Sequence, residues 1–160
     1  MISSERDARH AARNEIRRKL WQWGGTMEKI RRLEQERDFY RRRVDDARVT
    51  LKSPDFSGMP KGGKSSDLSD VIVGVMREAE RYERQLGRID AEIAAALEHR
   101  NRMQDCISRL TPIQEKIITY RYGDGYNWRY IAIKTNYDEA SVRRIDAQSA
   151  DAIAAMLENA

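Results

Sequence analysis

The chain has few of the residues that cross-links and metal sites require. Its 160 residues include one cysteine, Cys106, and two histidines, His10 and His99, which lie far apart in the sequence. One cysteine cannot form an internal disulfide bond, and these three residues do not make a zinc site. We therefore expect no metal, no cofactor and a reducing, cytoplasmic environment.

Long apolar runs, prolines and aromatic residues are also scarce. Charged residues make up 35% of the chain, aromatic residues make up 8%, and there are three prolines. No apolar stretch approaches the length of a membrane span, so we expect no membrane partner. The near absence of alternating β-branched runs predicts an all-α protein. So high a charged fraction argues against a single large globular core.

Two stretches carry apolar side chains at alternating steps of three and four, which is the spacing of a heptad seam. They run over residues 30–51 and 72–110. Residues 52–66 between them are rich in proline, glycine and serine, which indicates a loop. The pattern predicts a long antiparallel helical hairpin, a coiled coil, over residues 26–109.

Three pairs of positions are expected to face each other in this hairpin: Val44 and Ala79, Tyr40 and Tyr82, and Leu33 and Ile89. Arg37 and Arg100 interrupt the seams, and a charged seam position often limits register or oligomer number. A homodimer formed through the longer seam is the alternative.

Residues 110–160 carry the start and stop signals of three short helices. These signals are Thr111-Pro112, Gly123-Asp124-Gly125, Asn127, Asn136 and Asp138. Thr111 and Pro112 favour a helix start, Asn127 and Asp138 are N-capping residues, and Asn136 tolerates a left-handed helix end. Two helices joined by so short a turn are typical of a helix-turn-helix, whose second helix reads double-stranded DNA.

The final helix separates into two faces. Its apolar stripe is expected to pack on the other helices and consists of Val142, Ile145, Ser149, Ala152, Ile153 and Met156. Off this stripe, Arg143 and Arg144 could contact guanine or hold a phosphate, and Glu139 could accept a hydrogen bond from cytosine. The helix start at Asn127, with Arg129 beside it, suits a phosphate oxygen. The alternative is a small helical domain whose arginines are only solvated.

Residues 110–118, 121–132 and 141–145 together resemble the fourth conserved region of bacterial sigma factors. More narrowly, the chain resembles the sigma-like phage and prophage transcription regulators of the ArpU and RinA type. The segment Gly58-Met-Pro-Lys-Gly-Gly63 adds to the narrower resemblance, and all these stretches together make up 32 of the 160 residues. The resemblance implies a sequence-specific transcription regulator, phage or prophage encoded, that acts at promoters in the cytoplasm of a bacterial host. Host RNA polymerase is a further expected partner.

The resemblance also implies which side chains face DNA. Glu139, Ala140 and Arg143 match the base-facing positions of the sigma-type recognition helix, and Arg144 lies next to them. The whole set expected to contact DNA is Asn127, Trp128, Arg129, Lys134, Glu139, Ala140, Ser141, Arg143 and Arg144. Thr135 departs from the family pattern, because an apolar residue, usually leucine, closes the core at that position.

The first 25 residues are expected to form a separate basic helix that ends where Gly24-Gly25 interrupts it. Its basic residues are Arg6, Arg9, Arg13, Arg17, Arg18 and Lys19. This surface either contacts nucleic acid or polymerase, or is a solvated face. Trp21 and Trp23 are expected to cover the open end of the hairpin, near Leu97.

Positive charge lies mostly far from the expected DNA-binding end. Residues 1–66 contain 17 Lys and Arg against 10 Asp and Glu, whereas residues 111–160 contain 6 against 7. Affinity for duplex DNA grows with the number of phosphates neutralised. The remaining binding energy is therefore expected from the basic N-terminal segment or from a partner protein.

No catalytic constellation is present, and we expect no enzyme. Residues 58–65 fit the phosphate-loop pattern G-x-x-x-x-G-K-S, but the residues before them are charged and have a helical period. A phosphate loop needs a buried strand there.

Two alternatives to a regulator stay open. One is a phage DNA-packaging recognition subunit, similar to a small terminase, whose coiled coil builds a ring. The other is a structural adaptor that binds no DNA.

Overall fold

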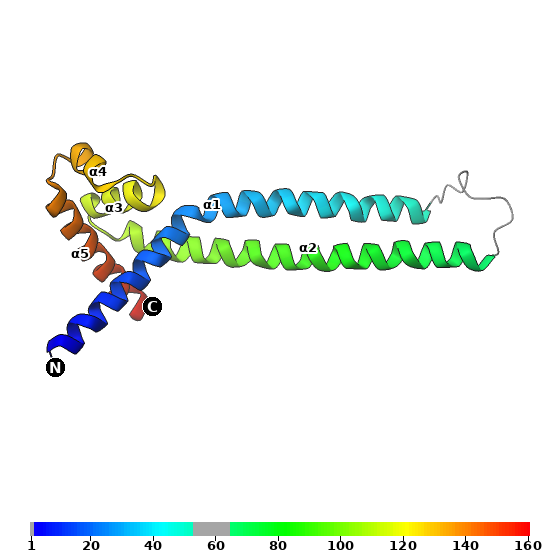
Figure 1. Cartoon of the computed structure of the whole chain (residues 1–160), viewed down its shortest axis with the longest axis horizontal. Coiled ribbons are helices and arrows are strands. Elements are labelled where there is room, and N and C mark those ends of the chain that lie inside the picture. Colours follow the sequence, from blue (N-terminus) through cyan, green and yellow to red (C-terminus); the bar gives the residue numbers. More distant parts are fainter. Residues whose placement is uncertain (1, 53–64) are drawn as a thin grey trace. The chain divides into compact units, whose positions relative to one another are not determined.

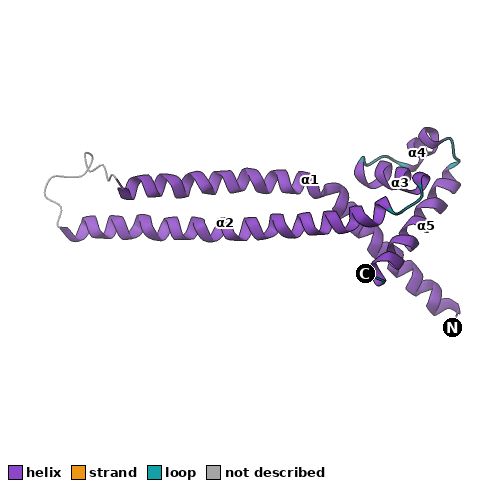
Figure 2. Cartoon of the chain, turned by 180° about the vertical axis from the view of Figure 1, so that it is seen from behind, coloured by secondary structure: helices purple, strands orange, loops and turns teal. Residues whose placement is uncertain are grey.

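A computed structural model describes residues 2–52 and 65–160, and these two ranges contain no strand (Figure 2). The elements are α1 (Ile2–Lys52), α2 (Ser65–Ser108), α3 (Pro112–Ile118), the π-helical turn η1 (Thr119–Gly123), α4 (Trp128–Thr135) and α5 (Glu139–Glu158) (Figure 1). The predicted all-α class is confirmed. The body of the expected loop at 52–66 and most of the glycine-rich segment at 58–65 lie outside the described residues.

The chain divides into two compact units. One contains Met1–Lys29 together with Ala96–Ala160, and the other is Ile30–Ala95. Each unit draws residues from both α1 and α2. The N-terminal 25 residues, which the sequence suggested as a segment of their own, share a unit with the C-terminal helices.

The unit Ile30–Ala95 is an antiparallel helix pair (Figure 1). Its buried apolar side chains are Ile30, Leu33, Val44, Ala79, Ile89 and Ile93. The rings of Tyr40 and Tyr82 lie with their centroids 5.8 Å apart, as the seam predicted. Arg48 pairs with Glu83 at 3.0 Å across the two helices. The predicted hairpin is therefore confirmed within one chain, and a dimer through the longer seam stays a prediction.

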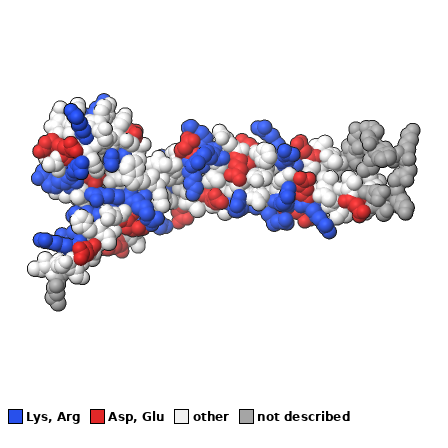
Figure 3. Space-filling model, in the orientation of Figure 1, with Lys and Arg blue, Asp and Glu red and all other residues white. Residues whose placement is uncertain are grey.

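Charged side chains of both signs alternate over the face of this pair that Figure 3 shows. Arg37 of the α1 seam reaches Asp90 of α2 at 3.7 Å. The charged seam position is thus neutralised inside the hairpin. Exposed ion pairs of this kind contribute little to stability, so the buried apolar seam is the main source of cohesion.

The expected break at Gly24-Gly25 is wrong, because α1 continues through both glycines. A Cβ atom on Gly24 would overlap the backbone carbonyl of Tyr122, whereas a Cβ atom on Gly25 would meet nothing. Gly24 therefore marks a close approach of α1 to the backbone of η1. No local pattern distinguishes a glycine at such a close approach from a glycine that ends a helix.

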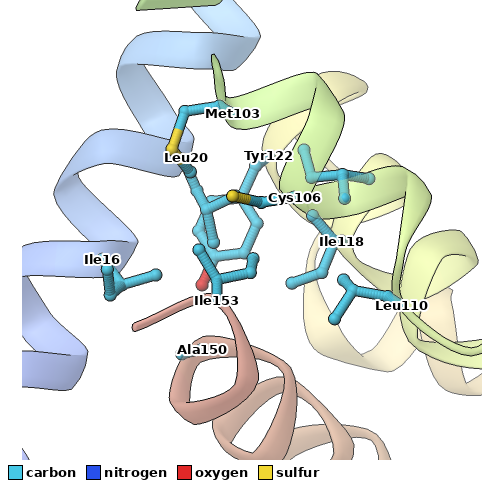
Figure 4. Close-up of a cluster of buried hydrophobic side chains, with 10 residues drawn as sticks. Ile16, Leu20, Met103, Cys106, Leu110, Ile118, Tyr122, Ala150 and Ile153 are labelled. Carbon is cyan, nitrogen blue, oxygen red and sulfur yellow. The ribbon is translucent and has the colours of Figure 1, made fainter. Parts of the chain in front are cut away.

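The core of the other unit joins both ends of the chain (Figure 4). Its buried residues are Ile16 and Leu20 of α1, Met103, Cys106 and Ile107 of α2, Leu110, Ile118, Tyr122, and Ala150 and Ile153 of α5. Burying one such large apolar side chain stabilises a fold by about 1.5–3 kcal/mol. The N-terminal part of α1 is thus part of the core on which the C-terminal helices rest.

Both tryptophans of α1 contact η1. The Trp21 ring meets the Tyr122 ring edge to face, with 4.9 Å between the centroids. Trp23 packs against the core and lies beside Gly123. The contacts that the structure gives these indoles are therefore with η1, whereas the sequence suggested the neighbourhood of Leu97.

Candidate nucleic-acid interface

The helix-turn-helix begins and ends where its capping residues predicted. The Asn127 Oδ1 atom accepts a hydrogen bond of 2.8 Å from the Tyr130 amide at the start of α4. Asn136 ends α4 in the left-handed conformation, with a φ of 58°. The Asp138 Oδ1 atom then accepts a bond of 2.9 Å from the Ser141 amide at the start of α5. The turn between α4 and α5 is therefore only Asn136–Asp138 long.

A small apolar cluster fixes α4 against α5. Ile117, Ile131 and Val142 have no exposed surface, and Tyr126 and Trp128 pack against them. Thr135, which departs from the family pattern, donates its hydroxyl to the Ile131 carbonyl at 2.8 Å. The Thr135 hydroxyl therefore has its hydrogen-bond partner within α4.

The buried face of α5 agrees with the predicted stripe and extends beyond it. Val142, Ser149 and Ile153 are fully buried, as are Asp146 and Ala150, which the sequence reading left out. The opposite side of the first turns carries Ala140 and Arg144, and both are exposed. The start of α5 thus presents one arginine and one methyl group directly away from the core.

Asp146 is the largest omission of the sequence reading. Its carboxylate is fully buried, and one oxygen accepts two hydrogen bonds from Arg17, at 3.0 and 3.2 Å. The other oxygen accepts the Tyr122 hydroxyl at 2.9 Å. Burial, and then the charge of Asp146, raise the pKa of Tyr122, so this hydroxyl stays a donor. A charged residue on the expected buried stripe was the signal that could have revealed this network.

A second ion pair joins α1 to α5. Arg13 binds both carboxylate oxygens of Asp151 at 2.8 Å. This bond lowers the pKa of Asp151. Arg18 pairs along its own helix with Glu15. Three of the six basic residues expected on an N-terminal DNA-binding surface therefore form ion pairs within the chain, two of them with α5.

Tryptophan and arginine side chains alternate next to the start of α5. The Arg121 guanidinium lies 5.2 Å from the Trp21 ring centre and 4.4 Å from that of Trp128. The Arg143 guanidinium lies 5.6 Å from the Trp128 ring centre. We call Trp21, Arg121, Trp128 and Arg143 the Arg/Trp stack. Through this stack, Trp21 of α1 is linked by Arg121 to the first turns of α4 and α5.

The Arg/Trp stack borders a cavity of about 260 Å³, whose remaining lining comes from Arg17, Tyr122 and Asp146. Sequence reasoning missed Arg121 entirely as a candidate site residue. Its place between Trp21 and Trp128 depends on a contact between segments far apart in the chain. No local pattern could have indicated it.

Of the predicted site residues, Trp128 and Arg143 line this cavity and the others do not. Glu139 and Arg143 form an ion pair of 3.0 Å, with side chains 48% and 58% exposed. Arg144 lies 3.4 Å from the Ser141 hydroxyl. Arg129 is exposed on the first turn of α4. Lys134 sits at the other end of α4, where its ammonium is 5.5 Å from the Tyr130 ring centre, and it does not line the cavity.

Comparisons with known protein families, with curated proteins and with solved structures find no match for this chain. Within the described residues, no helix has both the length and the apolar composition needed to cross a bilayer.

Proposed function

We propose that this protein is a sequence-specific, double-stranded DNA-binding transcription regulator that inserts the first turns of α5 into a major groove. The observation that supports it most is the rigid α4–α5 corner with exposed arginines at the start of its second helix. The resemblance to sigma region four and to ArpU and RinA regulators favours a phage or prophage origin. It also favours promoters as targets and host RNA polymerase as a partner in the bacterial cytoplasm.

The two arginines of α5 have different surroundings, and we assign them different roles. Arg144 is exposed and forms no ion pair among the described residues, so its guanidinium can fork onto guanine O6 and N7. Ala140, one turn earlier, offers a methyl group to a thymine methyl. The Arg143 guanidinium instead lies over the Trp128 ring and forms an ion pair with Glu139.

The start of α4 suits a phosphate of the DNA backbone. The Asn127 side chain is already bound to the Tyr130 amide, which leaves the amides of Trp128 and Arg129 to face outward. Amides at a helix start attract anions, and the exposed Arg129 adds a positive charge. This contact would set the position of the protein on DNA without reading sequence.

Residues 2–29 supply part of the charge that the C-terminal segment lacks. Arg13 and Arg17 are neutralised by Asp151 and Asp146, but Arg9 and Lys19 belong to the same unit as α5 and have no carboxylate at ion-pair distance among the described residues. They can add electrostatic attraction to duplex DNA. The protein acts in this account by binding, not by catalysis.

The test is a selection of duplexes from a random pool, followed by fluorescence anisotropy at fixed salt. We expect an enriched motif that the protein binds on the order of 10³-fold or more tightly than a scrambled duplex. Arg109→Ala, an exposed arginine outside the corner, is the matched control and should bind as the wild type does. Failure to enrich any motif would defeat the proposal.

One observation favours a second candidate, the packaging recognition subunit. The hairpin unit exposes apolar side chains that a ring of several copies could cover: Phe39, Val49, Val71, Val73 and Met76. Light scattering on the purified chain separates the candidates. A ring of many copies supports packaging, whereas a monomer or dimer supports the regulator.

A further inference from the structure

We infer that Arg121 is a phosphate-binding residue and that the cavity beside the Arg/Trp stack is a site for one phosphate group. The phosphate is supplied by the DNA backbone next to the bases that α5 contacts. The DNA source of this phosphate rests on the proposed function. The inference goes beyond that function by assigning a binding role to a residue outside α4 and α5.

Arg121 is held firmly but is not neutralised. Its guanidinium lies between the indoles of Trp21 and Trp128, and one N–H donates to the Tyr126 carbonyl at 3.0 Å. Among the described residues, no carboxylate forms an ion pair with it, and the Tyr126 carbonyl is the one hydrogen-bond acceptor of its N–H groups. A guanidinium fixed in this way keeps its charge and several donors ready for an anion.

The charges around the cavity leave a positive excess. Asp146 is the one carboxylate in its lining, and Arg17 already matches that charge at 3.0 Å. Arg143 shares its charge with Glu139 and still borders the cavity. Arg121 therefore gives the cavity a net attraction for an anion. Its half-buried position strengthens that attraction above the value in free solvent.

The chemistry of the cavity favours a phosphate over a nucleobase. Each of the two indoles already has a guanidinium against its ring, so stacking a base there would first have to displace an arginine. The guanidinium edges, by contrast, offer N–H donors in the fork that matches phosphate oxygens. A cavity of about 260 Å³ has room for such a group.

The position of the cavity agrees with a backbone contact. Trp128 is the first residue of α4, and Arg143 lies on the second turn of α5. A phosphate that contacts Arg121 and Arg143 together would lie beside the groove in which Arg144 is placed. Trp21 of α1 packs against the Arg121 guanidinium, so in such a contact it orients Arg121 without touching DNA itself.

The experiment measures binding of Arg121→Ala to an enriched duplex and to a random duplex over a range of salt concentrations. We expect affinity for both duplexes to fall by the same factor, about tenfold, because a phosphate contact carries no sequence information. The slope of log affinity against log salt should become shallower by about 0.9. Arg121→Lys keeps the charge but loses the planar fork, so its affinity should lie between the affinities of the wild type and Arg121→Ala.

The matched control is Arg109→Ala, which removes an exposed arginine away from the cavity and should leave affinity and slope unchanged. Near-ultraviolet circular dichroism checks that each variant keeps its core. If wild type and Arg121→Ala bind both duplexes equally well with the same slope, the inference is overturned and the proposed function stands.

A second measurement needs no variant to fold. Sodium phosphate is titrated into the wild-type protein at constant ionic strength, and tryptophan fluorescence is recorded. If the wild type binds no duplex, the proposed function fails, and this titration then tests the phosphate site by itself. A saturable change in fluorescence that chloride does not produce supports a site for free phosphate in the cavity. No change in fluorescence would show that the cavity holds no phosphate.

Discussion

Arg17 and Asp146 lie 129 residues apart in the chain, and the Arg17 guanidinium donates two hydrogen bonds to one oxygen of the buried Asp146 carboxylate. This contact attaches the N-terminal part of α1 to the middle of α5. The Tyr122 hydroxyl occupies the other oxygen, so the carboxylate is satisfied from both sides. The orientation of α5 therefore depends on residues near the start of the chain.

Arg17→Ala should destabilise the protein by about 2–4 kcal/mol, because it leaves a buried carboxylate with one neutral partner. The Arg17 side chain is 32% exposed, which places the expected loss at or below the range for fully buried pairs. Urea unfolding followed by circular dichroism measures it.

Arg18→Ala serves as the control, since Arg18 pairs with Glu15 on the exposed side of α1. It should leave stability nearly unchanged, because water screens an exposed ion pair. Equal losses for the two variants would contradict the role given to Asp146.

Gly24→Ala and Gly25→Ala should change stability in opposite directions. A methyl group on Gly24 meets the Tyr122 backbone, which cannot move away as a flexible side chain would, so we expect a loss of about 1–3 kcal/mol. A methyl group on Gly25 meets open space, and alanine is the better helix former by about 1 kcal/mol. Thermal unfolding of both variants is the measurement, and a stabilising Gly24→Ala would show that α1 does not approach η1 so closely.

Acid should weaken the start of α5. The hydrogen bonds from Ser141 lower the pKa of Asp138 from its ordinary value of 3.8. A carboxyl whose pKa is lower in the folded state stabilises the protein above its unfolded value, and this contribution is lost as the pH falls through the folded value. We expect wild-type stability to fall on acidification below pH 3.8.

Asp138→Asn provides the comparison, because asparagine caps a helix about as well but does not titrate there. The variant should match the wild type near neutral pH and lose less stability in acid. Asp151→Asn tests the same effect at the Arg13 pair, where a hydrogen bond also lowers the carboxyl pKa. Parallel acid curves for wild type and Asp138→Asn would speak against the cap.

The elements set by local chemistry were predictable from the sequence. Asn127, Asn136 and Asp138 cap or end their helices as their side chains favour, because capping involves only neighbouring residues. The hairpin register around Tyr40 and Tyr82 also followed from the heptad pattern, since a repeated seam fixes which positions face each other.

What depended on distant contacts was not predictable. Gly24 looks like a helix breaker until Tyr122 is placed beside it. Arg121 looks like an ordinary exposed arginine until Trp21 and Trp128 enclose it. Arg17 resembles its basic neighbours, and only its partner Asp146 distinguishes a structural ion pair from a DNA contact.

If the first turns of α5 read base pairs, wild type and Arg144→Ala should select different DNA sequences from the same random pool. We expect the variant to lose the preference at one guanine position, at a cost of about 1–3 kcal/mol, and to keep the rest of the motif. Recovery of the same motif, with the same strength at every position, by both proteins would contradict this role of α5.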